Sequence, residues 1–421
     1  MERAPVPPVP PLVPRGATLV TPRCAMAAGE VIMTVSRRER RMKIVAGAFF
    51  ACLLAVAGIA RPAMAESARQ SFDLRVLDAP HAVRTDAGMQ VFQELHLTNS
   101  TDAPLAVARV EVVDAADGQV LAAFAGEDLQ RRLALIGAPL AARDTTVPPG
   151  RHGVVYIEWP VHDRCPAAIE HVVTYAAPGG AGQGSVRGAR ATVAYATGTP
   201  LGPPLRGGPW IAVHAAAWRN GHRRVFNTVD GMARIPGRFA VDFIRVDATG
   251  RMTRGNPDVP GDWLGYGAAV LAVADASVAA VRDAMAESVS VSGNPKHALA
   301  EDAGNYVALR LDDGRYAFYE HLRPGSVAVR VGQRVHRGEV LGQLGFTGAS
   351  VGPHLHFHVS DGPSTIASEG RPFVLDAFDL LGAYADPGMF GKAVWTPRNE
   401  AEARRRQAEW PAENAVVRFA D

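Results

Sequence analysis

Alternation of apolar and polar residues is the main pattern along this chain, and long stretches with helical periodicity are rare. Between residues 66 and 197 the segments that show it are 72–76, 94–99, 107–113 and 154–159. A period of two is the period of a β-strand with one buried face. Turn signals such as Asp117-Gly118 and Pro148-Pro149-Gly150 separate these segments. We therefore predict a β-sandwich of roughly immunoglobulin-like type over residues 66–197.

A second β-rich region follows a short stretch of glycine and proline at residues 198–209, a composition typical of a linker. Its strand candidates are 270–273, 278–281, 306–311 and 316–319. These indicate an antiparallel β-sheet domain over residues 210–375, in which 283–304 is a hairpin or surface insertion. We expect residues 376–421 to form a polar C-terminal tail with a short charged helix at 399–409.

One strand candidate carries three histidines, in the run Gly352-Pro353-His354-Leu355-His356-Phe357-His358-Val359. Strand alternation places the three imidazoles on one face and the apolar residues between them on the other. Neutral imidazole is a common zinc ligand, so this face can supply part of a metal site. A strand with surface histidines is the alternative. It is less favoured, because the whole chain has only 13 histidines.

At these residues the sequence resembles the lysostaphin/LytM family of zinc metallopeptidases, which cut peptide bonds in bacterial peptidoglycan. The matching motifs, in chain order, are Tyr319-Glu320-His321-Leu322, the glycine-spaced run 329–338, Thr347-Gly348, Gly352-Pro353 and His354-Leu355-His356-Phe357. Several motifs in the right order are more specific than any one of them. The resemblance covers roughly residues 210–362. It implies a barrel-like antiparallel sheet whose open face forms a groove for the peptide.

The resemblance also implies a Zn²⁺ cofactor and assigns roles at the site. A hydrolytic zinc site needs three protein ligands and an open position for water. By the motif match, Asp242 is a carboxylate ligand and His356 an imidazole ligand. His354 and His321 match the two non-ligand histidines of the family. These would orient or deprotonate the water and stabilise the developing oxyanion.

The first ligand position departs from the family pattern. Four residues before Asp242 the family has a histidine, whereas this chain has Arg238, which stays protonated and cannot bind a metal. The best substitute ligand is His222, in Asn220-Gly221-His222-Arg223-Arg224, and Asn220 is a weaker one. The alternative for His222 is a surface histidine beside two arginines. If His222 fills the position, Arg238 is free to pair with a carboxylate near the groove.

Two further residues have competing interpretations. Asp242 is either a ligand or a structural carboxylate paired with Arg238 or Arg245. His358 stands where the family commonly has a carboxylate or an amide. We expect it to support a neighbouring ligand or to be neutral, with no ligand role of its own. Arg238 is a second residue that we expect to support the site, by pairing with a carboxylate.

We expect residues 1–65 to be absent from the mature protein. Residues 1–41 are rich in proline and indicate a disordered extension or a mis-chosen start codon. Residues 42–65 have the pattern of a signal peptide, with basic residues just before an apolar run at 44–60 and Ala63-Met64-Ala65 as the cleavage site. A transmembrane anchor is the alternative, although the run is slightly short for one. We expect export to the periplasm or cell envelope.

Charge and cysteine content narrow the functional classes. A net charge of +2 offers no electrostatic basis for binding nucleic acid. Of the three cysteines, Cys24 and Cys52 lie in the segments expected to be removed, so Cys165 would be unpaired and a disulfide scaffold is excluded.

The resulting hypothesis is an exported zinc endopeptidase that hydrolyses the peptide cross-links of peptidoglycan. The alternative, kept open by Arg238, is a metal-deficient LytM-like protein that binds the cell wall and activates amidases. For the β-sandwich we expect targeting, substrate-side binding or contact with an envelope protein.

Overall fold

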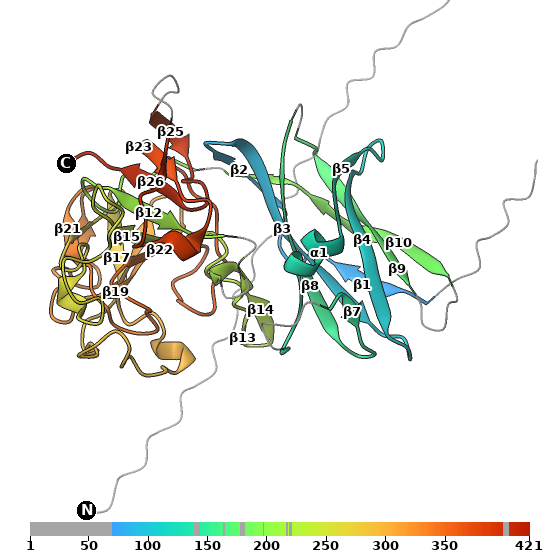
Figure 1. Ribbon diagram of the computed structural model, residues 1–421, viewed down its shortest axis with the longest axis horizontal. Coiled ribbons are helices and arrows are strands. Elements are labelled where there is room, and N and C mark those ends of the chain that lie inside the picture. The colour runs from blue at the N-terminus through green and yellow to red at the C-terminus, as the bar shows by residue number, and fades with distance from the viewer. Residues whose placement is uncertain are drawn as a thin grey trace, which may run out of the picture. The chain divides into compact units, whose positions relative to one another are not determined.

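The computed structural model describes residues 70–421 except for 139–143, 163–164, 177–181, 197, 216–217, 219–220 and 399–403. The expected extension and signal peptide lie outside the described residues, as does Asn220. The described residues are mainly β, as predicted, and nearly all of their strand pairs are antiparallel (Figure 1). In the part of the chain that the structure describes, no helix is long and apolar enough to cross a membrane.

Two sheets make up the N-terminal region. The first has the order β11-β2-β3-β8-β6, with β1 beside β3. Its strands are β1 (Phe72–Arg75), β2 (His81–Thr85), β3 (Gly88–Asn99), β6 (Leu133–Leu135), β8 (His152–Pro160) and β11 (Ala194–Tyr195). The second has the order β10-β9-β4-β5, with β7 beside β4. Its strands are β4 (Leu105–Asp114), β5 (Val120–Ala125), β7 (Thr146–Val147), β9 (Ala168–Ala176) and β10 (Gln183–Thr192), and β5 leads into the helix α1 (Gly126–Arg132).

One apolar cluster joins these two sheets. Leu95 and Leu97 from β3 and Val110 and Val112 from β4 are fully buried in it. On each strand the buried residues are two apart, so they face the same side and meet those of the other sheet. The N-terminal region is therefore a two-layer β-sandwich. Its classification as immunoglobulin-like stays a prediction.

His171, on β9, is a fully buried histidine of this sandwich, and its Nδ1 lies 3.2 Å from the carbonyl oxygen of Ala189. Burial lowers the pKa of His171 from 6.5 to about 4. Between these two values the unfolded chain binds a proton at this position and the folded chain does not. The free energy of unfolding therefore falls as the pH falls through that range, by up to about 1.4 kcal/mol per pH unit from this one group.

We expect His171→Asn to remove this contribution. In urea unfolding between pH 4 and 6.5, the free energy of unfolding of the variant should fall less steeply with decreasing pH than that of the wild type. His336→Asn, at an exposed histidine, is the matched control for the substitution. Equal pH slopes in wild type and His171→Asn would contradict the assignment.

An 11-stranded sheet carries the C-terminal region, with the order β20-β17-β18-β19-β22-β15-β12-β26-β23-β24 and β25 beside β23. Its strands are β12 (Trp210–Val213), β15 (Val241–Arg245), β17 (Ala276–Arg282), β18 (Asn305–Leu311), β19 (Tyr316–Leu322), β20 (Arg334–Val335), β22 (Leu355–Ser360), β23 (Leu375–Ala383), β24 (Thr396–Pro397), β25 (Arg405–Glu409) and β26 (Ala415–Arg418). The sandwich and this sheet belong to one compact unit.

Smaller elements complete this region. Two strand pairs stand apart from the large sheet: β13 (Asn227–Val229) with β14 (Met232–Arg234), and β16 (Ala269–Leu271) with β21 (Val340–Gln343). The short 3₁₀ helices are η2 (His222–Arg224), η3 (Pro260–Asp262), η4 (Leu299–Glu301) and η5 (Pro387–Met389). Residues 283–304, where we expected a hairpin or a surface insertion, form a loop that contains η4 and no strand.

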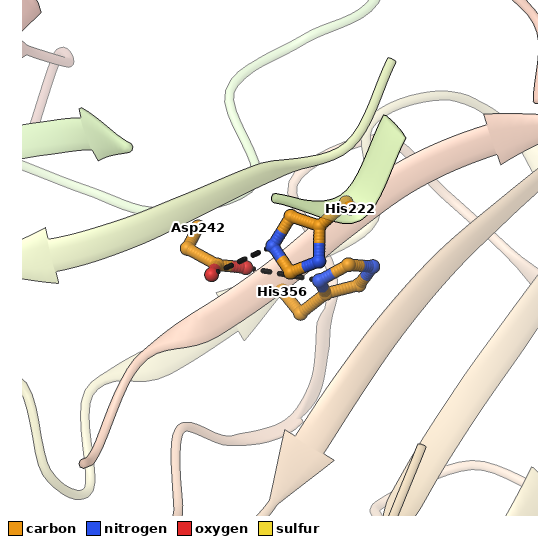
Figure 2. Close-up of side chains that lie close together, drawn as sticks. All are labelled: His222, Asp242 and His356. Atoms are coloured by element: carbon orange, nitrogen blue, oxygen red, sulfur yellow. Dashed lines mark hydrogen bonds and ion pairs between the residues drawn. The ribbon is translucent and has the colours of Figure 1, made fainter. Parts of the chain in front are cut away.

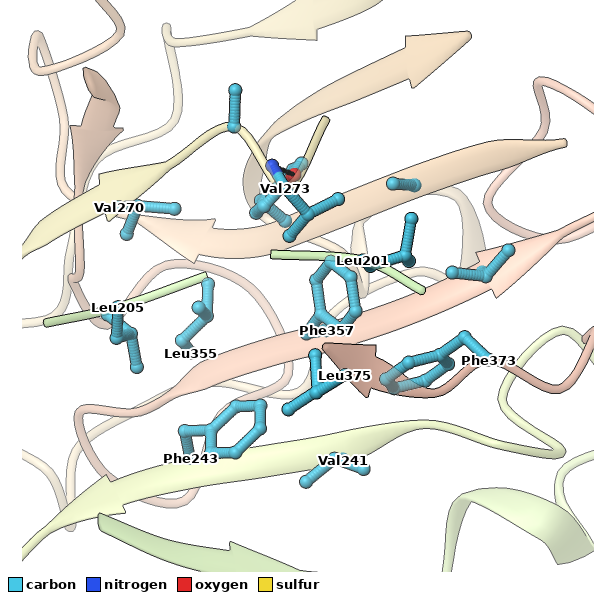
Figure 3. Packing of buried hydrophobic residues seen from close by; sticks show 14 of the residues in the cluster. Leu201, Leu205, Val241, Phe243, Val270, Val273, Leu355, Phe357, Phe373 and Leu375 are labelled. Atoms are coloured by element: carbon cyan, nitrogen blue, oxygen red, sulfur yellow. Dashed lines mark hydrogen bonds between the residues drawn. The ribbon is translucent and has the colours of Figure 1, made fainter. Parts of the chain in front are cut away.

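The glycine- and proline-rich segment 198–209 packs into the core of the C-terminal region. Leu201 and Leu205 are buried in the same cluster as Phe357 and Leu375 (Figure 3). The backbone N–H of Leu201 also donates to the carbonyl oxygen of Val374, at 2.9 Å. A linker composition does not reveal this anchoring, because it is the two leucines between the glycines and prolines that bury apolar surface.

The expected C-terminal tail is wrong, since β23, β25 and β26 are strands of the large sheet. The expected charged helix at 399–409 is also wrong over its described part, because Arg405–Glu409 form β25 and pair with β23. Residues 399–403 lie outside the described residues. Pairing with β23 satisfies the backbone and places Arg405 3.2 Å from Asp379, and such tertiary contacts override a helical preference.

Candidate metal centre

Three neighbouring strands of the large sheet place polar side chains directly opposite one another. Asp242 on β15 lies opposite His356 on β22, and Glu320 on β19 lies opposite His356 on the other side. Residues directly opposite each other in a sheet face the same side. Leu355 and Phe357 are fully buried on the reverse side, so the predicted alternation along this strand is confirmed.

His222 reaches the same point from η2, which is not part of the sheet. Its Nε2 lies 2.8 Å from Oδ2 of Asp242, and Nδ1 of His356 lies 2.9 Å from Oδ1 (Figure 2). Gly237 permits this approach, since a Cβ at that position would lie 2.8 Å from Cβ of His222. One ligand atom from each of His222, Asp242 and His356 lies within 4.8 Å of the others. The structure thus brings the three predicted ligands together.

The donor set and its protonation fit zinc. Two imidazole nitrogens and a carboxylate oxygen are ligands that zinc takes in hydrolytic sites. Burial would raise the pKa of Asp242, but His222 and His354 together hold it well below its ordinary value, so this carboxylate is ionised. Burial, with His222 adding to it, lowers the pKa of His356 to about 4, so its ring is neutral at pH 7. A metal needs both of these forms.

His358 and Glu320 lie behind His356. Nε2 of His356 is 3.1 Å from Nδ1 of His358, and a carboxyl oxygen of Glu320 lies 3.9 Å from each of the two rings. When Nδ1 of His356 binds a metal, its Nε2 carries the proton and can donate to Nδ1 of His358. His358 is thus within hydrogen-bond distance of His356, and its role as a support for that ligand stays a prediction. Burial, with Asp242 adding to it, raises the pKa of Glu320 to about 8, so this carboxyl group is protonated at neutral pH.

A β-bulge turns His321 toward the site. Asn305 pairs with Leu322 and Val307 with Tyr319, so β19 has one residue more than β18 over this stretch. His321 has φ 63°, a left-handed conformation that is uncommon outside glycine. Regular alternation would send His321 to the face opposite Glu320. The bulge re-aims the side chain, and both residues line the same groove.

His321 and His354 form a pair beside the three ligand candidates, with ring centroids 4.7 Å apart. Nδ1 of His321 donates to the carbonyl oxygen of Thr347 at 2.8 Å, and Nδ1 of His354 donates to that of Gly352 at 2.7 Å. Each ring therefore offers its Nε2, and that of His354 lies 3.4 Å from Oδ1 of Asp242.

The two rings differ in how readily they take up a proton. Burial, with His354 adding to it, lowers the pKa of His321 well below its ordinary value. Burial would also lower the pKa of His354, but Asp242 raises it above its ordinary value. A neutral ring beside a more readily charged one is an arrangement that allows separate base and acid roles.

Arg238 is not at the ligand cluster. Its buried guanidinium donates through Nε to Glu94 at 2.8 Å and through Nη1 to Asp78 at 2.7 Å, and it also pairs with Glu369. Arg245, the other partner considered for Asp242, lies over the ring of Trp210 at 5.0 Å. Asp242 contacts histidines, as a ligand would, so pairing with either arginine does not explain its position.

The cluster lies in a groove of about 490 Å³. Apolar side chains make up much of its lining, among them Trp218, Trp263, Val351, Ile366 and Phe390. A concave apolar surface with a few convergent polar groups is typical of a ligand-binding site. Sequence reasoning missed the part played by Glu320, which lies within a matching motif but had no role assigned to it. It also missed the apolar walls of the groove, which belong to no motif.

One family model matches part of the chain. The family model described as Peptidase family M23 matches residues 264–368. This span includes His321, His354 and His356, but it begins after His222 and Asp242.

Several solved structures are also similar to the chain. The catalytic domain of the antimicrobial peptidase lysostaphin from Staphylococcus simulans is 19% identical over 39% of this chain and 88% of that one, with a TM-score of 0.22. A putative peptidase M23 from Pseudomonas aeruginosa is 16% identical over 63% and 89%, with a TM-score of 0.24. The M23 metalloprotease pseudoalterin is 14% identical over 50% and 96%, with a TM-score of 0.26.

Proposed function

We propose, from the match of residues 264–368 to the model of peptidase family M23, that the protein is a zinc-dependent endopeptidase acting on the peptide cross-links of bacterial peptidoglycan. One observation carries the proposal. His222 lies beside Asp242, with its Nε2 2.8 Å from that carboxylate, so it can supply the ligand that Arg238 cannot. A chain that had lost its metal site would have no need for a replacement ligand in that place.

The residues divide the chemistry between them. His222, Asp242 and His356 would hold the zinc, which when bound supplies Lewis acidity toward a water molecule and a carbonyl oxygen. His321, held through Nδ1 by the carbonyl of Thr347, presents an unprotonated Nε2 that accepts a proton from the attacking water and passes it to the leaving amine. His354 presents its Nε2 as a donor that stabilises the negative charge developing on the carbonyl oxygen.

The shape and lining of the groove support a peptide as the substrate. Its apolar walls can accept an extended chain with small side chains, and the polar groups converge at one place along it. The catalytic groups lie on β19, β22 and the segments next to them, so rigid sheet strands fix their spacing.

Metal removal tests the proposal. Purified protein should release muropeptides from peptidoglycan by cutting an amide bond within the peptide, lose this activity in a chelator and regain it when zinc is added back. The same preparations should be tested with and without an added amidase. Stimulation of the amidase by protein that releases nothing itself when zinc is present would overturn the proposal in favour of the activator.

We also propose export to the periplasm or cell envelope, supported by the basic residues at 37–43, the apolar run at 44–60 and the cleavage site at 63–65. The mature chain should then begin at Glu66. N-terminal sequencing of the protein from an envelope fraction checks this, and a chain that still carries residues 1–42 would refute it.

A further inference from the structure

The residue after the candidate ligand His222 is bound to the β-sandwich. The guanidinium of Arg223 is buried, with 6% of its side chain exposed, and donates to β3 and β8. Nε donates to Oε1 of Glu94 at 2.6 Å, and Nη1 donates to Glu158 at 3.1 Å. Nη2 donates to the carbonyl oxygens of Gln93 at 2.6 Å and Ile157 at 2.8 Å. These hydrogen bonds hold the turn that carries His222 against β3 and β8 of the β-sandwich.

Glu94 connects this turn to the segment on the other side of His222. One of its oxygens accepts from Arg223 and the other from Nε of Arg238, at 2.8 Å. Arg238 follows Gly237, the residue against which His222 packs. The carboxylate of Glu94 therefore holds both segments between which the His222 side chain lies.

Electrostatics favour this bridge. Burial would raise the pKa of Glu94, but Arg238 and Arg223 lower it, so the carboxylate stays ionised between two guanidinium groups. Hydrogen bonds between charged groups in planar, forked geometry are both strong and directional. Each arginine donates its Nε to a different oxygen of Glu94, so the carboxylate sets the positions of both guanidinium groups.

The turn needs support of this kind. η2 has three residues, and a 3₁₀ turn of that length has few internal hydrogen bonds with which to hold its place. Asp242 and His356, in contrast, are held by paired strands of the large sheet. A metal ligand has to be placed to within roughly 0.5 Å to be effective.

We propose that the β-sandwich is a structural part of the metal centre, in which Glu94 acts through Arg223 and Arg238 as the positioning residue for His222. This rests on the proposed zinc site. It gives the sandwich a role at the site itself, in addition to any binding of wall or partner. It also gives Arg238 a function, because the residue that replaces the usual ligand helps to hold the substitute.

Arg223→Lys tests the proposal, because lysine keeps the buried positive charge but cannot make the forked contacts. The apparent Kd for Zn²⁺, measured on the full chain by competition with a chelator, should rise about 10- to 100-fold. The visible absorption of the Co²⁺-substituted protein should weaken, because a site that His222 has left admits more than one water molecule and so goes from four ligands to five or six. Arg398→Gln is the matched control, because it removes a different contact between the sandwich and the C-terminal sheet, at Asp86, and should leave both readouts unchanged.

The outcomes separate the inference from the zinc site. Arg223→Lys that binds zinc and Co²⁺ as wild type does, even with lowered stability, overturns the positioning role while the zinc site stands. Wild-type protein that binds no zinc overturns both. If Arg223→Lys does not fold, Glu94→Gln keeps the shape of the positioning residue and removes the charge that both guanidinium groups contact. An unchanged Kd for Zn²⁺ in that variant would then count against the proposal, and a several-fold rise would support it.

Discussion

Asp242→Ala should lose its zinc and all measurable release of muropeptides. Asp242 touches both other ligand candidates, with oxygens 2.8 Å from His222 and 2.9 Å from His356. In zinc sites each ligand contributes on the order of 3 kcal/mol, so removing one should weaken binding roughly a hundredfold or more. His222→Ala should weaken it comparably. Elemental analysis after dialysis and a zinc titration provide the measurement.

The control for these two variants is His336→Ala, at a histidine whose side chain is 82% exposed. It should keep the zinc content of the wild type. Equal zinc in Asp242→Ala and wild type would refute the ligand assignment. If Asp242→Ala loses zinc while the titration curve of His222→Ala is unchanged, His222 is not the replacement ligand.

Substituting the two non-ligand histidines should abolish catalysis without removing the metal. His321 has φ 63°, so asparagine, which tolerates the left-handed region, is the variant that removes the imidazole with least strain. His321→Asn and His354→Gln should each lower the rate of muropeptide release by a factor on the order of a hundred or more. Both should bind zinc as wild type does. Release at the wild-type rate by zinc-loaded His321→Asn would rule out its role as the base.

The features that sequence predicted are those set by neighbours along the chain. Strand alternation placed His354 and His356 on one face because the period of a strand is a local property. His222 could be named only by elimination, since nothing near it in sequence shows that Gly237 leaves space for it. The bulge at His321 was not predicted, because it depends on how β19 pairs with β18.

Contacts between distant segments account for the other differences. Arg223 and Glu94 are 129 residues apart, and each has the sequence context of an ordinary charged residue. The charged segment that ends at Glu409 is a strand because it pairs with β23. The pattern of charged residues within the segment gives no information about this distant partner. Glycine and proline in 198–209 indicated a linker, whereas the burial of Leu201 and Leu205 depends on strands far along the chain.

These long separations bear on when the site forms as the protein folds. Asp242 and His356 are 114 residues apart, and the bridge through Glu94 spans more. Closing loops of this length costs chain entropy before any contact repays it, and chains dominated by distant pairings fold slowly. The metal centre should therefore be among the last parts to assemble. A newly made chain would carry every catalytic side chain and still be unable to hold the metal until both layers had docked.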